Sequence, residues 1–488
     1  MRQLGDWGLR MAGGIGGVLL LPAMAVAAEH PPIELPFWTV IPFVALLLTI
    51  AILPLVAEHF WHRNRNKALV TVLFAAPVAA YLFYLGPTTH GASTEALTHE
   101  MQQYASFIIL LGSLYTVAGG IFVQCRFPAH PLTNSALLGV GAVLANFIGT
   151  TGASMLLIRP MLRINRQRRN VIHVPIFFIF IVSNLGGLLT PLGDPPLFLG
   201  FLRGVDFFWT FRLWPQWLVA VGSVLLIFLV WDTIAFRREK PHAHPLPLPD
   251  ILPPEEPPLT KRRLEVHGYI NVLFLAGILA GVLLQSEELG ANLAGWLAYL
   301  SITVGNVSLG FPEAEITMVV MALLSLVLTP RAYRQANDFN WSAITEVAVL
   351  FAGIFVTMVP ALQLLSQYGH HFSIDQPRQY FWLTGVLSSF LDNAPTYVTF
   401  ATLAGGSSNF SLLANNQVAG IAGAQILQAI SCGAVFMGAN TYIGNGPNFM
   451  VKAMAEASGF RTPSFFGYLL YSIVILLPVF VLITVLFF

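Results

Sequence analysis

Two aspartates of this 488-residue chain stand beside helix-breaking residues within long apolar stretches. Asp194 follows the run SNLGGLLTPLG at residues 183–193 and precedes two prolines, and Asp392 lies in LDNAPT at residues 391–396. A carboxylate at bilayer depth is costly and usually marks a binding site. Glycine and proline free backbone carbonyls, which are tolerated at that depth only inside the protein or along a cavity. One such interruption in each half of a membrane protein is typical of a secondary transporter.

The residues around these interruptions supply the oxygen ligands that a hard cation such as Na⁺ prefers: carboxylate, amide, hydroxyl and carbonyl. Removal from water favours the protonated form of a carboxyl group, so a buried aspartate can exchange a proton for Na⁺. This competition is the simplest chemistry of an antiporter. We therefore expect an ion site formed by Thr150, Thr151, Ser183, Asn184, Asp194, Asp392, Asn393, Asn440, Thr441 and Asn445, with Asn184, Asp194, Asp392 and Asn393 as the metal ligands.

The same features also have structural interpretations. Glycine pairs such as the one at 186–187 occur where membrane helices pack closely, and an asparagine can make an interhelical hydrogen bond. Other charged residues fit structural roles better. Asp232 lies near two arginines at 237–238, and we interpret it as an interfacial ion pair with them. Lys452 and Glu456 have the four-residue spacing of a helical ion pair.

The composition predicts a helical membrane protein. Hydrophobic residues make up 56% of the chain and charged residues only 10%, with a mean hydropathy of +0.71, whereas soluble domains carry about 25% charged residues. Apolar runs of about 20 residues, the length of a membrane helix, recur along the chain, and the short alternating segments of a membrane barrel do not. The net charge of +1 gives no reason to expect a nucleic-acid partner.

Sequence motifs of enzymes and of resident metals are missing. There is no HExxH, no GxSxG and no Cys/His cluster, and the glycine-rich segment at 444–447 lacks the Lys-Ser/Thr of a nucleotide loop. The two cysteines, Cys125 and Cys432, are far apart and do not suggest a disulfide framework. We expect no enzymatic activity and no cofactor, the ions involved being the transported Na⁺ and H⁺.

The apolar runs divide into two similar halves. Each half should contain a re-entrant helical hairpin and a discontinuous helix, at 134–162 and 171–203 in the first and at 377–404 and 420–456 in the second. The remaining expected segments are helices at 37–56, 68–86, 104–124, 213–235, 269–285, 313–329, 343–367 and 464–487 and an amphipathic piece at 291–304. The domains are thus a first transmembrane repeat at 36–235, a polar linker at 236–268 and a second transmembrane repeat at 269–488.

Charge predicts how these halves are oriented. Basic clusters at 63–67, 159–169, 237–263 and 331–334 alternate with acidic segments at 87–103 and 286–292, and basic loops stay in the cytoplasm. The linker is then cytoplasmic and the two hairpins enter from opposite sides, which makes the halves inverted repeats. Residues 1–28 have the pattern of a signal peptide or an uncleaved anchor. We expect a multi-pass protein of the inner membrane.

The chain resembles the ion transporter superfamily, and within it the NhaD-type sodium/proton antiporters and citrate-transporter-like proteins. The segments that carry the resemblance are SNLGGLLTPLGD at 183–194, LSSFLDNAP at 387–395 and MGANTYIGNGPN at 437–448. The resemblance implies an all-α membrane protein of about 11–13 spans, with inverted repeats, two re-entrant hairpins and two discontinuous helices. It also implies a homodimer, movement of the hairpin domain during transport, and Asn184, Asp194, Asp392 and Asn393 as ion-site residues.

The chain departs from the NhaD pattern in its first hairpin. NhaD-type antiporters have Asp-Asn where this chain has Gly149-Thr150, and the Gly-Asp-Pro-Pro at 193–196 looks more like the anion-permease and arsenite-pump-like branches. The favoured function is a sodium (or lithium)/proton antiporter. The alternative is a sodium- or proton-coupled citrate or dicarboxylate symporter. That alternative needs a positive group near the substrate, and no Lys or Arg lies at the centre of an interruption.

Overall fold

The computed structural model describes residues 33–61, 63–125, 127–239, 264–284, 303–304, 307–308, 313–337, 339–372, 374–417 and 422–488. The expected signal segment at 1–28, most of the linker at 236–268, the acidic segment at 286–292 and nearly all of the amphipathic piece at 291–304 lie outside these ranges. Nothing in the described residues bears on those expectations.

The described chain is an all-α integral membrane protein. Within the described residues, six helical segments are long and apolar enough to cross a membrane, by length and composition: Phe37–Pro54, Asn64–Leu85, Pro131–Asn165, Phe207–Arg238, Ile344–Tyr368 and Phe465–Phe487. Strands are limited there to two short antiparallel pairs, β1 (Phe122–Cys125) with β2 (Leu264–His267) and β3 (Thr303–Val304) with β4 (Val307–Ser308). The cysteines Cys125 and Cys432 are free, as expected.

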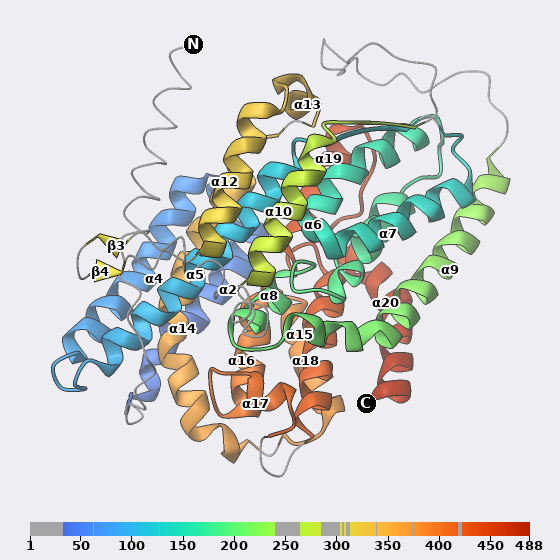
Figure 1. Ribbon diagram of the computed structural model, residues 1–488. Coiled ribbons are helices and arrows are strands. Elements are labelled where there is room, and N and C mark those ends of the chain that lie inside the picture. Colours follow the sequence, from blue (N-terminus) through green and yellow to red (C-terminus); the bar gives the residue numbers. More distant parts are fainter. Residues whose placement is uncertain are drawn as a thin grey trace.

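The helices form two groups; most of the first lies to the left of most of the second in Figure 1, and α8, α10 and α16 are drawn near the middle. The scaffold group consists of α2 (Ile41–Val56), α4 (Asn64–Leu85), α5 (Ala92–Ala118), α10 (Ile270–Leu284), α12 (Glu313–Leu328) and α14 (Ser342–Tyr368). The hairpin group consists of α6 (Pro131–Asn165), α7 (His173–Ile181), α8 (Pro195–Leu202), α9 (Trp214–Arg238), α15 (Pro377–Ser388), α16 (Asn393–Gly405), α18 (Gly423–Met437), α19 (Gly446–Ala457) and α20 (Phe465–Phe487). Short connecting helices are α3 (Glu58–Trp61), α13 (Arg331–Ala336) and α17 (Ser411–Ala414), with 3-10 turns η1 (Phe37–Val40), η3 (Phe207–Leu213) and η5 (Gly369–His371).

The first hairpin is α6, which is two antiparallel limbs rather than one straight helix. Gly149 breaks it with φ 74° and ψ 156°, a conformation that side chains other than glycine rarely adopt. The two ends meet, because the amide groups of Asn134 and Asn165 donate to each other's oxygens at 2.9 Å. The hairpin expected at 134–162 is therefore present.

The second hairpin consists of α15 and α16, which are joined by residues 389–392. Its first limb packs closely on α18 at two glycines. A Cβ at Gly385 would overlap the side chain of Met437, and a Cβ at Gly433 would lie 2.5 Å from the carbonyl oxygen of Phe381. Small residues let membrane helices approach in this way, so this limb and α18 are in close contact.

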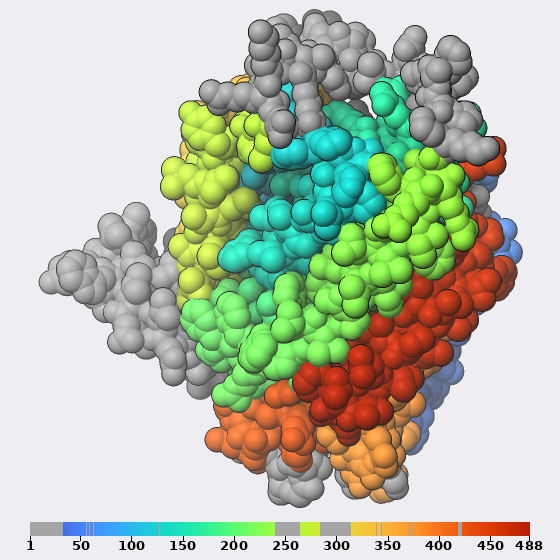
Figure 2. All heavy atoms as spheres, turned by 90° about the vertical axis from the view of Figure 1, so that its right-hand side faces the viewer, coloured from blue at the N-terminus to red at the C-terminus, as the bar shows by residue number. Residues whose placement is uncertain are grey.

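Two helices of the hairpin group are discontinuous, as the sequence indicates. The first break, residues 182–194, separates α7 from α8 and contains the 3-10 turn η2 (Leu185–Leu188). The second break, residues 438–445, separates α18 from α19 and contains the 3-10 turn η6 (Gly438–Asn440). The closing helices α9 and α20 lie side by side on one face of the molecule, in light green and dark red in Figure 2. Their outward residues, such as Leu226 and Val474, are exposed and apolar, as lipid contact requires.

The structure confirms one of the two expected ion pairs and corrects the other. Lys452 Nζ lies 2.9 Å from Glu456 Oε1, four residues along α19. Asp232, however, is fully buried, and its carboxylate lies against Arg168 and His173 instead of the nearby arginines. The expected pairing of Asp232 with Arg237 and Arg238 is wrong because its position on α9 faces the first hairpin, whereas those two arginines are exposed.

Candidate ion-binding site

Asp194 is the centre of a cluster in which both breaks and both hairpin tips meet. It precedes α8 as the N-cap, but its side chain makes no capping hydrogen bond to that helix. Its Oδ1 instead accepts from the hydroxyl of Thr150 at 2.8 Å and from Asn445 Nδ2 at 3.1 Å, and its Oδ2 accepts from Asn393 Nδ2 at 2.5 Å. The side chain is buried. A carboxylate is thus held by three neutral donors from three different elements.

Asn445 occupies the position in the second break that Asp194 occupies in the first. Each is the N-cap of the helix that follows its break, and neither caps that helix with its side chain. Their backbones match, with φ −145° and ψ 145° at Asp194 and φ −154° and ψ 141° at Asn445. Each follows a glycine, Gly193 or Gly444. The two repeats therefore contribute an equivalent pair of residues, only one of which carries charge.

Matching hydrogen bonds also fasten each hairpin to its break. The hydroxyl of Thr190 donates to the carbonyl of Asn146 at 2.5 Å, and the hydroxyl of Thr441 donates to the carbonyl of Ser389. The side-chain oxygens of Asn146 and Ser389 are used as well. A backbone N–H next to Thr190 donates to Asn146 Oδ1 at 2.8 Å, and Asn440 Nδ2 donates to Ser389 Oγ at 2.9 Å.

These anchors make Thr150 and Asn393 equivalent positions of the two hairpins. Thr150 follows Asn146 by four residues, and Asn393 follows Ser389 by four. Both reach Asp194. Asn440 and Thr441, which the sequence analysis assigned to the ion site, hold the second hairpin in place and make none of the hydrogen bonds to Asp194 described above.

A chain of amides extends the cluster behind Asp194. Asn184 Nδ2 donates to Asn448 Oδ1 at 2.7 Å, and Asn184 Oδ1 accepts from Asn445 Nδ2 at 3.2 Å. Asn445 also donates to the carbonyl of Ser183 at 3.1 Å, and the hydroxyl of Ser183 shares a hydrogen bond of 2.8 Å with that of Ser154. Asn448 is not among the ion-site residues predicted from the sequence, although its place within the first turn after the break, in GNGPN, is a usable signal.

Asp392 and Thr151 lie at the edge of this cluster. Asp392 is the N-cap of α16, and its Oδ1 accepts from the backbone N–H of Ala394 at 3.1 Å. It is half-buried and forms no direct hydrogen bond with Asp194. Thr151 is half-buried too and takes part in none of the hydrogen bonds described here. The arrangement is one central acid with a second acid near it at a helix N-terminus, where negative charge is favoured.

The electrostatic character of the cluster is negative. The hydrogen bonds and ion pairs that the structure gives for Asp194 involve no Lys, Arg or His. The described residues contain no group of three or more His, Cys, Asp and Glu that would hold a metal permanently. Asn393 Oδ1 is buried without a hydrogen-bond partner, and an unmatched oxygen acceptor beside a carboxylate is suited to a positive ligand.

Residues 32–488 match the model of a protein family whose description reads "putative citrate transport". This match covers both repeats and confirms the resemblance to citrate-transporter-like proteins. No curated protein matches the chain in sequence.

Proposed function

We propose that this chain, which belongs to the citrate-transport family and is a multi-pass membrane transporter, exchanges Na⁺ (or Li⁺) for H⁺ at Asp194. The observation that carries the proposal is a single buried carboxylate whose three hydrogen-bond partners are all neutral. An unbalanced charge in the membrane interior is costly. Either a proton or a cation removes that charge, so the two compete for one site.

The neighbouring groups are suited to both occupants. As donors, Thr150, Asn393 and Asn445 stabilise the bare carboxylate. As oxygen ligands they suit a cation. A half-turn of the Asn393 amide places the unpartnered Oδ1 where Nδ2 now stands, and the hydroxyl of Thr150 has free lone pairs for a metal ion. Asn184 and the carbonyl of Ser183 supply further oxygens within the same cluster.

The second candidate is a citrate or dicarboxylate symporter, which the family description favours. Anions often bind at helix N-termini, where backbone N–H groups are free. Here α8 begins with Pro195 and Pro196, which have no N–H, and α19 has Pro447 at its second position. An anion would also meet the carboxylate of Asp194. The chemistry of the cluster therefore supports a cation as the primary ligand.

Transport by purified protein in liposomes with a trapped pH dye separates the two candidates. Addition of Na⁺ or Li⁺ should move protons across the membrane, and K⁺ is the matched ionic control. Uptake of labelled citrate without Na⁺-driven proton movement would support the symporter and overturn the antiporter. Asp194→Asn should abolish the Na⁺ response, whereas Asp375→Asn, at an exposed position, should retain it. An unchanged Na⁺ response in Asp194→Asn would also overturn the proposal.

We also propose that the protein resides in the inner membrane as a homodimer, as the family resemblance implies. Light scattering of the detergent-solubilised protein, corrected for bound detergent, measures the mass of the assembly against the 53.3 kDa of one chain. A protein mass of one chain would contradict the dimer.

A further inference from the structure

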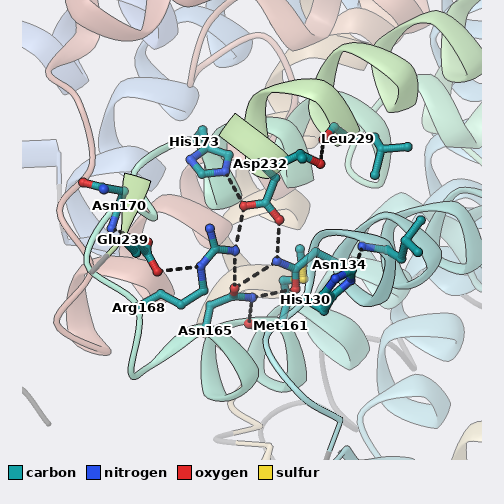
Figure 3. A network of polar contacts seen from close by, with 12 residues as sticks. His130, Asn134, Met161, Asn165, Arg168, Asn170, His173, Leu229, Asp232 and Glu239 are labelled. Carbon is teal, nitrogen blue, oxygen red and sulfur yellow. Dashed lines mark hydrogen bonds and ion pairs between the residues drawn. The ribbon is translucent and has the colours of Figure 1, made fainter. Parts of the chain in front are cut away.

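A second buried charge cluster lies at the base of the first hairpin, away from its tip (Figure 3). Its centre is Asp232 on α9, which is fully buried. Asp232 Oδ1 lies 2.6 Å from Arg168 Nη1 and 2.9 Å from His173 Nε2, and its Oδ2 accepts from Asn134 Nδ2 at 2.9 Å. A buried carboxylate with this many partners holds together the elements that supply them.

The elements that meet here are those that position the ion site. Asn134 lies in the first turn of the first hairpin and Asn165 is its last residue, and Arg168 Nη1 also donates to Asn165 Oδ1 at 3.3 Å. His173 is the first residue of α7, which leads into the first break. The limb from Asn134 to Thr150 is about 24 Å long at 1.5 Å per residue. The cluster is thus the point at which α9 holds the far end of that limb.

The charges of the cluster balance only when the imidazole is protonated. Arg168 Nε lies 3.4 Å from Glu239 Oε2, so two carboxylates face one guanidinium and one histidine. The net charge of these four side chains is zero when His173 is protonated and −1 when it is neutral. Because His173 and Asp232 are buried, this difference is poorly screened by solvent.

The added proton binds to a defined atom of His173. His173 Nε2 faces a carboxylate oxygen, which accepts only, so Nε2 carries hydrogen in both states and the added proton goes to Nδ1. The rings of Phe228 and Trp231 pack against the imidazole. The other charged side chains of the surrounding segments have different environments: Arg169, Arg237 and Arg238 are exposed, Arg166 is half-buried, Arg163 lies over Phe122, and Lys452 pairs with Glu456.

We propose that His173, Asp232 and Arg168 form a second proton-binding site, which holds the base of the first hairpin more firmly when His173 is protonated. When the imidazole is neutral, Asp232 has one charged partner instead of two, and the hairpin is held less firmly. The site is separate from Asp194 and binds a proton that is not transported. Its effect on transport rests on the proposed function, whereas its protonation does not.

The fluorescence of Trp231 tests protonation directly, because its ring stacks on His173 with centroids 6.5 Å apart and a protonated imidazole quenches a neighbouring indole. The emission of the wild type minus that of Trp231→Phe isolates this residue among the 10 tryptophans. The difference should change with pH in a single step. The same difference, measured between His173→Gln and the double variant His173→Gln/Trp231→Phe, should not change with pH. A difference that is flat in the wild type, or that titrates in the His173→Gln background, overturns the proposal.

The pH profile of transport tests the effect on the hairpin. His173→Gln keeps a neutral hydrogen-bond donor, so its Na⁺-driven proton movement should vary less between pH 6 and 8 than that of the wild type. His99→Gln, at an exposed histidine of α5, should keep the wild-type profile. An identical profile in His173→Gln and wild type overturns the coupling to the hairpin. Absence of Na⁺-driven proton movement in the wild type refutes the antiporter but leaves the fluorescence result standing.

Discussion

Two nearby glycines, Gly444 at the end of the second break and Gly446 at the start of α19, should respond in different ways to one added methyl group. A Cβ at Gly444 would lie 2.6 Å from the carbonyl oxygen of Gly438, 2.8 Å from that of Ser388 and 3.1 Å from that of Ser389. A Cβ at Gly446 would have no atom within 4 Å. The first change forces the break away from the second hairpin, whereas the second fills open space two residues further along.

The size of the effect follows from these distances. Ordinary contacts of a Cβ begin at 3.4 Å, so the closest oxygen at Gly444→Ala must move by about 0.8 Å. Overpacking of this kind costs about 1–3 kcal/mol, and we expect about 3 kcal/mol because all three neighbours are backbone atoms that cannot rotate away. At about 2 °C per kcal/mol for a large domain, the Tm should fall by about 6 °C. Gly446→Ala should stay within about 1 kcal/mol of wild type, since alanine favours a helix.

The assay is thermal unfolding of the purified protein in detergent, together with transport in liposomes. Gly444→Ala should lose both stability and transport, because the carbonyls it displaces connect the second break to the tip that carries Asn393. Gly446→Ala, at the first residue of α19, is the matched control. Equal melting temperatures for the two variants, or normal transport by Gly444→Ala, would refute the close packing on which the site depends.

Further predictions concern the first hairpin, the amide chain and the cysteines. Gly149→Ala should cost about 1–2 kcal/mol, because φ is 74° there, and should weaken cation binding, measured as the KM for Na⁺. Asn448→Leu leaves two carbonyls of the second break without donors and should cost about 3 kcal/mol in thermal unfolding. Burial raises the pKa of the Cys125 thiol, an effect that a nearby guanidinium partly offsets. Its maleimide labelling should therefore be slow at neutral pH and faster at higher pH, whereas the fully buried Cys432 should stay unlabelled in folded protein.

Each of these predictions has a clear contrary result. An unchanged KM and Tm in Gly149→Ala would argue against a sharp hairpin tip at that glycine. Wild-type stability of Asn448→Leu would mean that the amide chain is not needed to hold the break. Labelling of Cys432 at the same rate as Cys125 would contradict the packing of α18 inside the hairpin group.

The sequence predicted the breaks and hairpins well because their cause is local. Glycine, proline and polar residues within an apolar run of about 20 residues cannot continue a membrane helix undisturbed. The positions of Gly149 and of the two breaks could therefore be read from the chain. Asp194 was identified for the same reason, since an acid in such a run has few structural alternatives.

The roles of the other polar residues could not be predicted in the same way. Asn440 and Thr441 have the same types of groups as Asn445, but they face Ser389 and hold the second hairpin. Asp232 lies within two turns of two arginines, yet its partners are Arg168 and His173 from another part of the chain. The partners of each polar side chain depend on the direction in which its helix face points after packing.

The positions of the helix breaks could be predicted from the chain alone, because backbone conformation follows from neighbouring residues, and the same apolar runs singled out both Asp194 and Asp392. The donors that reach Asp194 are defined only in the folded protein. Its partners Thr150, Asn393 and Asn445 come from three elements up to 251 residues away along the chain. Whether these three side chains meet depends on how the two repeats pack against each other, and no local pattern of residues predicts that packing.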